Sequence, residues 1–242
     1  MHVSSRAFRD RRARVNLPNT ISAARIVAAP LLALLPFIPS VRVRFAAFAL
    51  YLVTAISDHW DGKIARERGL VTDLGKVLDP LADKLLLIGT FIPMFLLQAR
   101  PGDPLLEQLP VVAERSAYAF TTWGIEAIWF PWWVLVLIVG REAFMTWFRA
   151  FAQARGVVVA AQRLGKWKAG FQYTWLGAAY AWFWAKLAFD RNAWHGPVAT
   201  FLANLLGLIG LVTITVAFVL TLVSLADYLR RHRDLFRRPR VG

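Results

Sequence analysis

Hydrophobic residues form six long runs along the chain, and short polar segments separate most of them. A helix that crosses a membrane needs about 20 predominantly apolar residues. The second run is shorter than this, so we expect its helix to continue through the polar residues 57–66. The pattern predicts an all-α integral membrane protein with six transmembrane helices in one bundle, near residues 21–38, 45–56, 77–97, 128–151, 171–189 and 198–225.

The first run follows a basic segment, an order that is also found in secretory signal peptides. The run from Ile21 to Ile38 is long for a signal peptide, however, and no A-x-A-like cleavage site closes it. We therefore expect a retained first transmembrane helix. The chain divides into a basic N-terminal arm, a six-helix domain and a basic tail, at residues 1–19, 20–228 and 229–242.

Basic residues at both ends of the chain indicate its orientation. An even number of spans places both termini on one side of the membrane, and the positive-inside rule makes that side cytoplasmic. Arg42 and Arg44 fall in a short loop expected outside and count against this orientation, but the remaining loops favour it. Residues 98–126 form an irregular insertion on the outside. We expect a bacterial inner (plasma) membrane location, with the polar segment that follows the second run facing the cytoplasm.

The composition supports a membrane location. Of the 242 residues 57% are hydrophobic, and the mean hydropathy is +0.47, whereas soluble proteins are about 45–50% apolar. The absence of cysteine excludes disulfides, thiolate metal sites and a cysteine nucleophile. The net charge of +14 suits either nucleic acid or anionic lipid. Because the basic residues cluster at the ends of hydrophobic runs, we expect a membrane partner and no nucleic acid.

Four aspartates stand close together between residues 57 and 84. Asp58 and Asp61 are three residues apart and Asp79 and Asp83 are four apart, so each pair shares one helix face. Two helices joined by a turn near residues 69–73 would bring the pairs together. Four carboxylates repel each other and are costly near a bilayer, whereas Mg²⁺, Mn²⁺ and Ca²⁺ prefer carboxylate oxygens. The pattern therefore predicts a divalent metal site.

Simpler roles exist for single members of this segment. A lone Asp79 directly before Pro80 could begin a helix, with the proline at its first position. Asp73 lies outside the spacing and is expected to be an ordinary loop residue.

The residues between the aspartates suit a phosphate ligand. Gly62 and the small Ala65 allow a phosphate or nucleotide to approach the helix closely. Arg66 offers a planar fork of donors for phosphate. Gly75 lets the facing helix come near at the same level.

This segment resembles the signature of the CDP-alcohol phosphotransferase family. It reads D-x-x-D-G-x-x-A-R, eight residues, then G-x-x-x-D-x-x-x-D, from Asp58 to Asp83. The resemblance implies a six-helix membrane fold, usually dimeric, with two Mg²⁺ or Mn²⁺ ions at the cytoplasmic face. It further implies that Asp58, Asp61 and Asp79 hold metal, while Asp83 is a metal ligand that serves mainly as the catalytic base. The CDP-lipid would lie against Asp58, Gly62, Ala65, Arg66 and Gly75.

Two further stretches resemble the phosphatidylglycerophosphate synthase branch of that family. One is NLPNTISAARIVAAP at residues 16–30, and the other is GREAFMTWFRAFAQARG followed by RLGKWKAGFQ, within residues 140–172. A glycerol phosphate acceptor is a dianion and needs cations beside the metal. The candidate acceptor-phosphate ligands are Arg141, Arg149, Lys166 and Lys168, and Arg141 is notable because it falls inside an apolar run. Ala169 replaces the usual threonine of the branch, which leaves the acceptor open.

The resemblance implies phospholipid biosynthesis. The phosphatidyl group of CDP-diacylglycerol would pass to the hydroxyl of glycerol 3-phosphate, giving phosphatidylglycerophosphate and CMP. A relative with another acceptor, of the cardiolipin or phosphatidylinositol-phosphate type, would share the same metal motif. A cation transporter with buried carboxylates and a non-catalytic scaffold of the same fold are more remote alternatives. No internal symmetry of the kind found in transporters is evident.

Overall fold

Six long helices make up most of the described chain. The computed structural model describes residues 17–67, 73–102, 115–120, 124–156 and 163–231, apart from the side chains at 17–18, 58–67, 73–74, 76–77 and 163. The helices are α2 (Leu17–Leu34), α3 (Val41–Glu67), α4 (Asp73–Gln98), α5 (Trp132–Ala154), α6 (Arg163–Arg191) and α7 (Pro197–Arg231), and a 3₁₀ turn, η1 (Leu35–Phe37), follows α2. The basic segments 1–16 and 232–242 lie outside the described residues.

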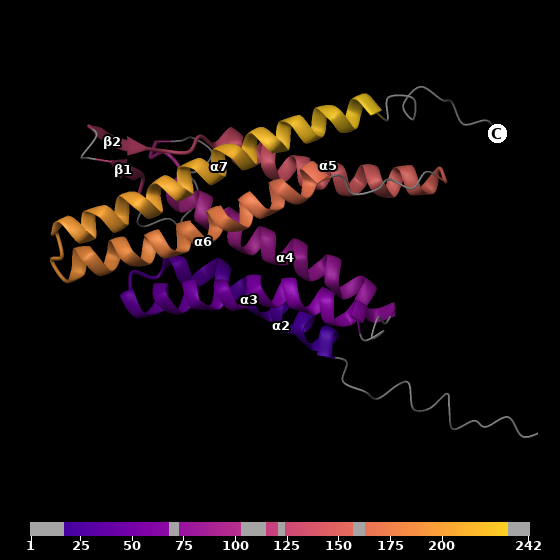
Figure 1. The fold of residues 1–242 in the computed structure, drawn as a ribbon, viewed down its shortest axis with the longest axis horizontal. Helices are drawn as coiled ribbons and strands as arrows, with labels where there is room; N and C mark the ends of the chain where they lie inside the picture. Colours follow the sequence, from indigo (N-terminus) through magenta and orange to yellow (C-terminus); the bar gives the residue numbers. More distant parts are fainter. Residues whose placement is uncertain (1–16, 68–72, 103–114, 121–123, 157–162, 232–242) are drawn as a thin grey trace, which may run out of the picture.

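Successive helices run in alternating directions (Figure 1). As a result, the start of α2 and the end of α7 lie toward the same end of the molecule. Each predicted hydrophobic run falls within or largely within one helix. The continuation of the second helix through residues 57–66 is confirmed, because α3 ends at Glu67.

The expectation of an all-α chain is wrong in one place. A short antiparallel pair, β1 (Tyr118–Phe120) and β2 (Ile125–Ile128), lies within the insertion between α4 and α5. Helix α5, which corresponds to the fourth hydrophobic run, therefore begins at Trp132 and not near residue 128. The two strands are held in place because the Tyr118 and Phe120 rings are buried against α7, where Gly207 and Gly210 leave room for them.

Three local expectations also need correction. Asp73 is the first residue of α4 and not a loop residue. Pro80 lies inside α4, so Asp79 does not begin a helix. Arg42 and Arg44 lie in the first turn of α3 and not in a loop, and the buried Arg44 guanidinium lies 5.9 Å from the centre of the Phe183 ring.

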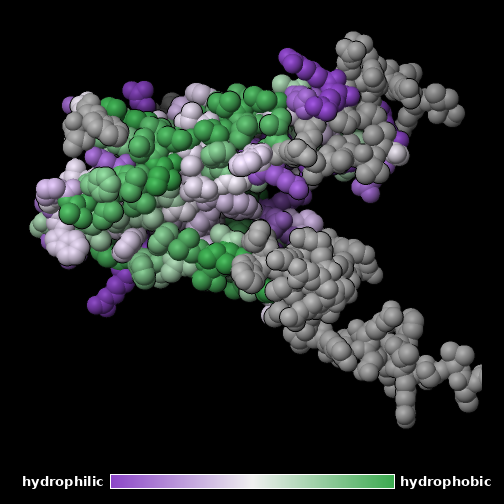
Figure 2. Space-filling view, in the orientation of Figure 1, coloured by the Kyte–Doolittle hydropathy of each residue, from purple (hydrophilic) through white to green (hydrophobic). Residues whose placement is uncertain are grey.

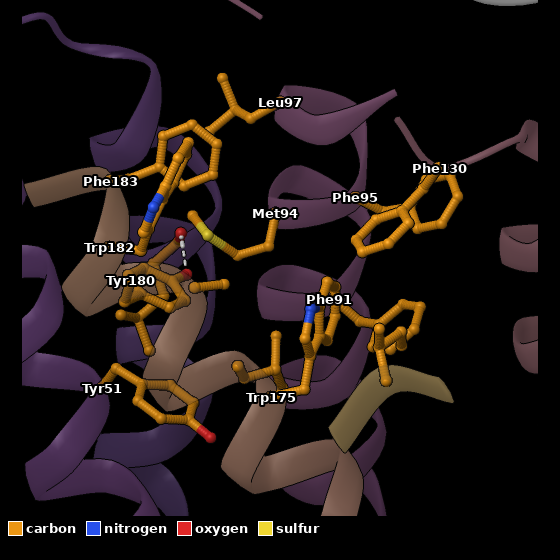
Figure 3. Close-up of a cluster of buried hydrophobic side chains, with 14 of the residues drawn as sticks. Tyr51, Phe91, Met94, Phe95, Leu97, Phe130, Trp175, Tyr180, Trp182 and Phe183 are labelled. Carbon is orange, nitrogen blue, oxygen red and sulfur yellow. Dashed lines mark hydrogen bonds between the residues drawn. The ribbon is translucent and has the colours of Figure 1, made fainter. Parts of the chain in front are cut away.

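Helix α6 forms the centre of the aromatic core (Figure 3). Trp175 on α6 packs against Phe91 of α4, with ring centres 4.7 Å apart, and Tyr180 stacks on Tyr51 of α3 at 5.1 Å. The Tyr180 hydroxyl also donates a hydrogen bond to the Leu32 carbonyl oxygen of α2 at 2.8 Å. Helix α6 thereby contacts α2, α3 and α4. Its Trp175 and Tyr180 side chains face these helices.

Three described helices are long and apolar enough to cross a membrane, over Asn19–Phe37, Leu78–Gln98 and Pro197–Arg231. The other three have lower hydropathy because α3 ends in a polar segment, α5 contains charged residues and α6 is rich in tryptophan and tyrosine. In Figure 2, hydrophobic side chains cover much of the middle of the visible face, and hydrophilic ones gather toward its ends. This distribution is typical of a membrane protein.

Helices α2 and α4 approach each other closely. A Cβ atom added at Gly89 of α4 would lie 2.7 Å from the carbonyl oxygen of Ala29 on α2, closer than two such atoms can stand. Glycine at this position therefore permits the contact. The contact sets the distance between α2 and α4, and both helices contribute to the site below.

Candidate active site

Helix α2 presents two polar side chains to the second aspartate pair. The Ser22 hydroxyl donates a hydrogen bond to Asp79 Oδ1 at 2.5 Å, and Arg25 Nη1 lies 2.9 Å from Asp83 Oδ1. Ser22 and Arg25 are three residues apart on α2, and Asp79 and Asp83 are four residues apart on α4. Each pair therefore occupies one face of its helix. Arg25 is 2% exposed, whereas the Asp83 side chain is 51% exposed. The carboxylates are thus anchored by two buried side chains while remaining accessible.

The first aspartate pair lies on α3. Asp58, Asp61, Gly62, Ala65 and Arg66 occupy the last three turns of this helix, and their side chains lie outside the described set. Five residues separate the end of α3 from the start of α4, so the ends of these helices must be near each other. Convergence of all four carboxylates stays a prediction. The described side chains alone contain no group of three metal-ligating residues.

The donor chemistry of α4 fits a divalent cation. Asp79 and Asp83 stand one turn apart at an accessible edge, and carboxylate oxygens are the ligands that Mg²⁺ and Mn²⁺ prefer. Gly75, one turn before Asp79, is buried in the first turn of the helix. The residues of this edge could therefore hold metal together with the pair on α3.

A cavity of about 790 Å³ lies between α4, α5 and α6. Asp83 and Lys84 line its α4 wall. All four residues expected to bind the acceptor phosphate line the same cavity, namely Arg141, Arg149, Lys166 and Lys168. The structure therefore brings the expected base and the expected phosphate ligands together, although they come from three helices. Apolar residues line the deeper part of the cavity, among them Leu87, Phe91 and Ile138.

A charged network crosses the cavity from α5 to α6. Glu142 Oε1 accepts a hydrogen bond from Arg141 Nη1 at 3.1 Å and is in contact with Lys168 Nζ. The Arg141 and Lys168 side chains are only 8% and 4% exposed, whereas that of Glu142 is 31% exposed. Two buried cations repel each other, and one carboxylate between them offsets this repulsion. The network keeps a net positive charge.

Burial lowers the pKa of Lys168 to about 7, and the charge of Arg141 acts in the same direction. The Glu142 carboxylate, which touches the ammonium group, favours the charged form. An anion that enters the cavity would favour it further. Lys168 is therefore suited to bind an anion that enters the cavity.

Sequence reasoning assigned no role to Ser22, Arg25 or Ser224. Arg25 could have been singled out from the sequence, because a charged residue inside an apolar run usually has a functional or paired role. Ser22 and Ser224 could not have been singled out in this way, since small polar residues are common in membrane helices. Gln172 belongs to a stretch noted for its resemblance, and its buried amide nitrogen at the cavity wall has no partner among the described residues.

Comparison with known proteins identifies the family of the chain. The profile of the CDP-alcohol phosphatidyltransferase family matches residues 15–225. That range includes both aspartate pairs and the cationic cavity. The chain belongs to the CDP-alcohol phosphatidyltransferase family. It is thus a member of an enzyme family whose members generally depend on divalent metal.

Individual relatives carry a more specific name. A CDP-diacylglycerol–glycerol-3-phosphate 3-phosphatidyltransferase of Rickettsia bellii is 47% identical over 81 residues, which are 34% of this chain and 44% of the relative. A protein of that name from Bacillus subtilis is 32% identical over 163 residues, covering 62% and 69%. A probable phosphatidylglycerophosphate synthase of Mycobacterium tuberculosis is 31% identical over 153 residues, covering 62% and 59%. The matches thus span about half to two thirds of these relatives.

The contact between Arg25 and Asp83 can be tested by substitution. We expect Arg25→Gln to reduce the free energy of unfolding by about 1–3 kcal/mol, less than for a fully buried pair because Asp83 is half exposed. Lys186→Gln is the matched control, since Lys186 pairs with Asp190 on the exposed surface of α6 at 3.5 Å, and it should change stability by under about 0.5 kcal/mol. Thermal unfolding in detergent, followed by tryptophan fluorescence, measures both. Equal effects of the two variants would contradict the anchoring role.

Proposed function

We propose that this protein transfers the phosphatidyl group of CDP-diacylglycerol to the hydroxyl of glycerol 3-phosphate, releasing CMP and forming phosphatidylglycerophosphate. One observation carries the proposal: Asp83 and the four cationic residues line a single cavity. The names of the relatives from Rickettsia bellii and Bacillus subtilis specify these two substrates. Membership in the family supports the class of reaction.

The cationic side of the cavity would bind the acceptor phosphate. Glycerol 3-phosphate carries two negative charges near neutral pH, and Arg141 and Lys168 offer buried, preorganised donors for it. Arg149 and Lys166 lie at the exposed rim of the cavity and add positive potential where a soluble anion would enter. Because the phosphate is fixed at this end, the hydroxyl at the other end of the three-carbon acceptor can reach the α4 wall.

Asp83 would accept the proton of that hydroxyl. The hydroxyl oxygen forms a bond to the phosphorus that carries diacylglycerol, the bond from this phosphorus to the CMP oxygen breaks, and CMP leaves. Arg25 holds Asp83 Oδ1 from the side of α2, which fixes the direction of the carboxylate. An aspartate is a weak base for an alcohol, so positioning of the reactants must supply much of the rate.

The nucleotide end of the donor would lie along α3 and the start of α4. We assign it to Asp58, Gly62, Ala65, Arg66 and Gly75, and we assign metal to Asp58, Asp61, Asp79 and Asp83. Two bound Mg²⁺ or Mn²⁺ ions would neutralise the pyrophosphate and stabilise the entering and leaving oxygens. The protein would hold these ions through carboxylates on two neighbouring helices.

The arrangement in the membrane follows from the direction of the helices. We propose that all six helices cross a bacterial inner membrane, within a domain of residues 20–228, and that both basic termini lie in the cytoplasm. The alternating helix directions and the common end of α2 and α7 support this topology. The active site would then face the cytoplasm, where glycerol 3-phosphate is available. A homodimer is inferred from the family resemblance alone.

An acceptor panel tests the proposed function. Purified protein in detergent with CDP-diacylglycerol and Mg²⁺ should release CMP with glycerol 3-phosphate, and chelation of the metal should abolish release. Serine lacks a phosphate and should give less than about a hundredth of that rate, as expected when charged groups in a site lose their partner. Inositol phosphate and phosphatidylglycerol are larger and should also be slower acceptors than glycerol 3-phosphate. If CMP is released with another acceptor but not with glycerol 3-phosphate, the proposed acceptor is wrong and the protein performs the same transfer to a different alcohol.

The role of Asp83 has its own test. Asp83→Asn should lower turnover by about 10²–10⁴-fold, because removal of a general base typically has an effect of that size. Binding of CDP-diacylglycerol should be partly retained. Asp190→Asn is the control, since Asp190 lies on the exposed surface of α6, where it pairs with Lys186. Full lipid transfer by Asp83→Asn would exclude Asp83 as the base.

A further inference from the structure

Ser224 lies on α7, the last helix, and contacts the acceptor side of the site without lining it. Arg141 Nη2 donates a hydrogen bond to Ser224 Oγ at 3.0 Å. Ser224 is 3% exposed, and its own hydroxyl donates to the Thr221 carbonyl oxygen at 3.1 Å. This second bond uses the hydroxyl proton, so an oxygen lone pair is directed to the guanidinium.

Arg141 is therefore held from two sides. Nη1 is bound to Glu142 on its own helix, and Nη2 is bound to Ser224 on a different helix. A guanidinium is planar, with its donors in fixed directions. Two bonds to different nitrogens therefore fix the plane of the group as well as its position. Arg141 lines the cavity, whereas Ser224 lies behind it.

The packing of the helices makes this support necessary. Helix α5 packs against α7 and α4, and at the site Glu142 of α5 is in contact with Lys168 of α6. A long arginine side chain beside a cavity has many rotamers. Restricting them before the ligand arrives reduces the loss of conformational freedom on binding.

We propose that Ser224 is a positioning residue that holds the Arg141 guanidinium in the orientation that binds the acceptor phosphate. It acts through Arg141 and does not touch the acceptor. The identity of the anion rests on the proposed function, whereas the orientation of Arg141 does not. The last helix thereby contributes to the affinity for the acceptor, although no residue of α7 lines the cavity.

The decisive variants are Ser224→Ala and Ser224→Thr. Loss of the hydroxyl should raise the KM for glycerol 3-phosphate, and its Kd measured by isothermal titration, about tenfold, as expected for one hydrogen bond to a charged group. The kcat and the KM for CDP-diacylglycerol should stay within about twofold. Ser224→Thr keeps the hydroxyl and should restore the wild-type KM. If the alanine variant does not fold in detergent, Ser224→Cys, a similar side chain with a weaker acceptor, replaces it.

A double-mutant cycle separates this role from simple packing. If Ser224 acts through Arg141, Ser224→Ala should add little to the rise in KM caused by Arg141→Lys. Thr215→Ala is the control on the same helix, because the exposed Thr215 hydroxyl donates its hydrogen bond to the Leu211 carbonyl of α7 itself. It should leave all constants unchanged.

Two results have different meanings. An unchanged KM in Ser224→Ala, with wild-type protein active on glycerol 3-phosphate, would overturn the positioning role and leave the proposed function intact. Wild-type protein inactive on glycerol 3-phosphate would contradict the proposed function instead. Titration with inorganic phosphate then tests Ser224 directly: a tenfold weaker Kd in Ser224→Ala supports the role, and an equal Kd overturns it.

Discussion

The burial of two cations beside one carboxylate is the constraint on which the cavity depends. Arg141 and Lys168 are nearly inaccessible, and Glu142 touches both. Such groups remain charged in a membrane protein only when each has a partner. The partners here come from different helices, so satisfying them fixes how α5, α6 and α7 stand relative to one another. The same arrangement leaves a positive charge that is only partly offset, and this charge makes the cavity a site for an anion.

The carboxylates of the site lie on the side of α4. Asp79 and Asp83 project from α4, and Ser22 and Arg25 hold them from α2. The close approach at Gly89 makes these contacts possible, because a larger side chain there would separate the two helices. Carboxylates that suit metal thus lie on one side of the site, and cations that suit phosphate line the other side. This division is what a transfer between a metal-bound nucleotide and a phosphorylated alcohol requires.

Much of this could be predicted from the sequence, because some signals are local. The six helices followed from the length of the hydrophobic runs, and the placement of Asp79 and Asp83 on one helix face followed from their spacing. Arg141 was conspicuous as a charge within an apolar run. The contacts of Ser22 and Ser224 could not be predicted, because they join residues 57 and 83 positions apart. The β1–β2 pair was missed because its two strands are very short and its stability comes from burial of Tyr118 against α7.

The central claim is that the cavity between α4, α5 and α6 binds the phosphorylated acceptor. The chain contains no cysteine, so Ala169→Cys would place a single thiol at the cavity wall, next to Lys168 on α6. The rate at which a soluble thiol reagent labels this cysteine, with and without glycerol 3-phosphate, measures occupancy directly. Glycerol 3-phosphate should slow labelling at least about tenfold at 10 times its Kd, and glycerol should not. Gly196→Cys, exposed before α7, should label equally in both cases. An unchanged labelling rate at Ala169→Cys under saturating glycerol 3-phosphate would contradict the claim.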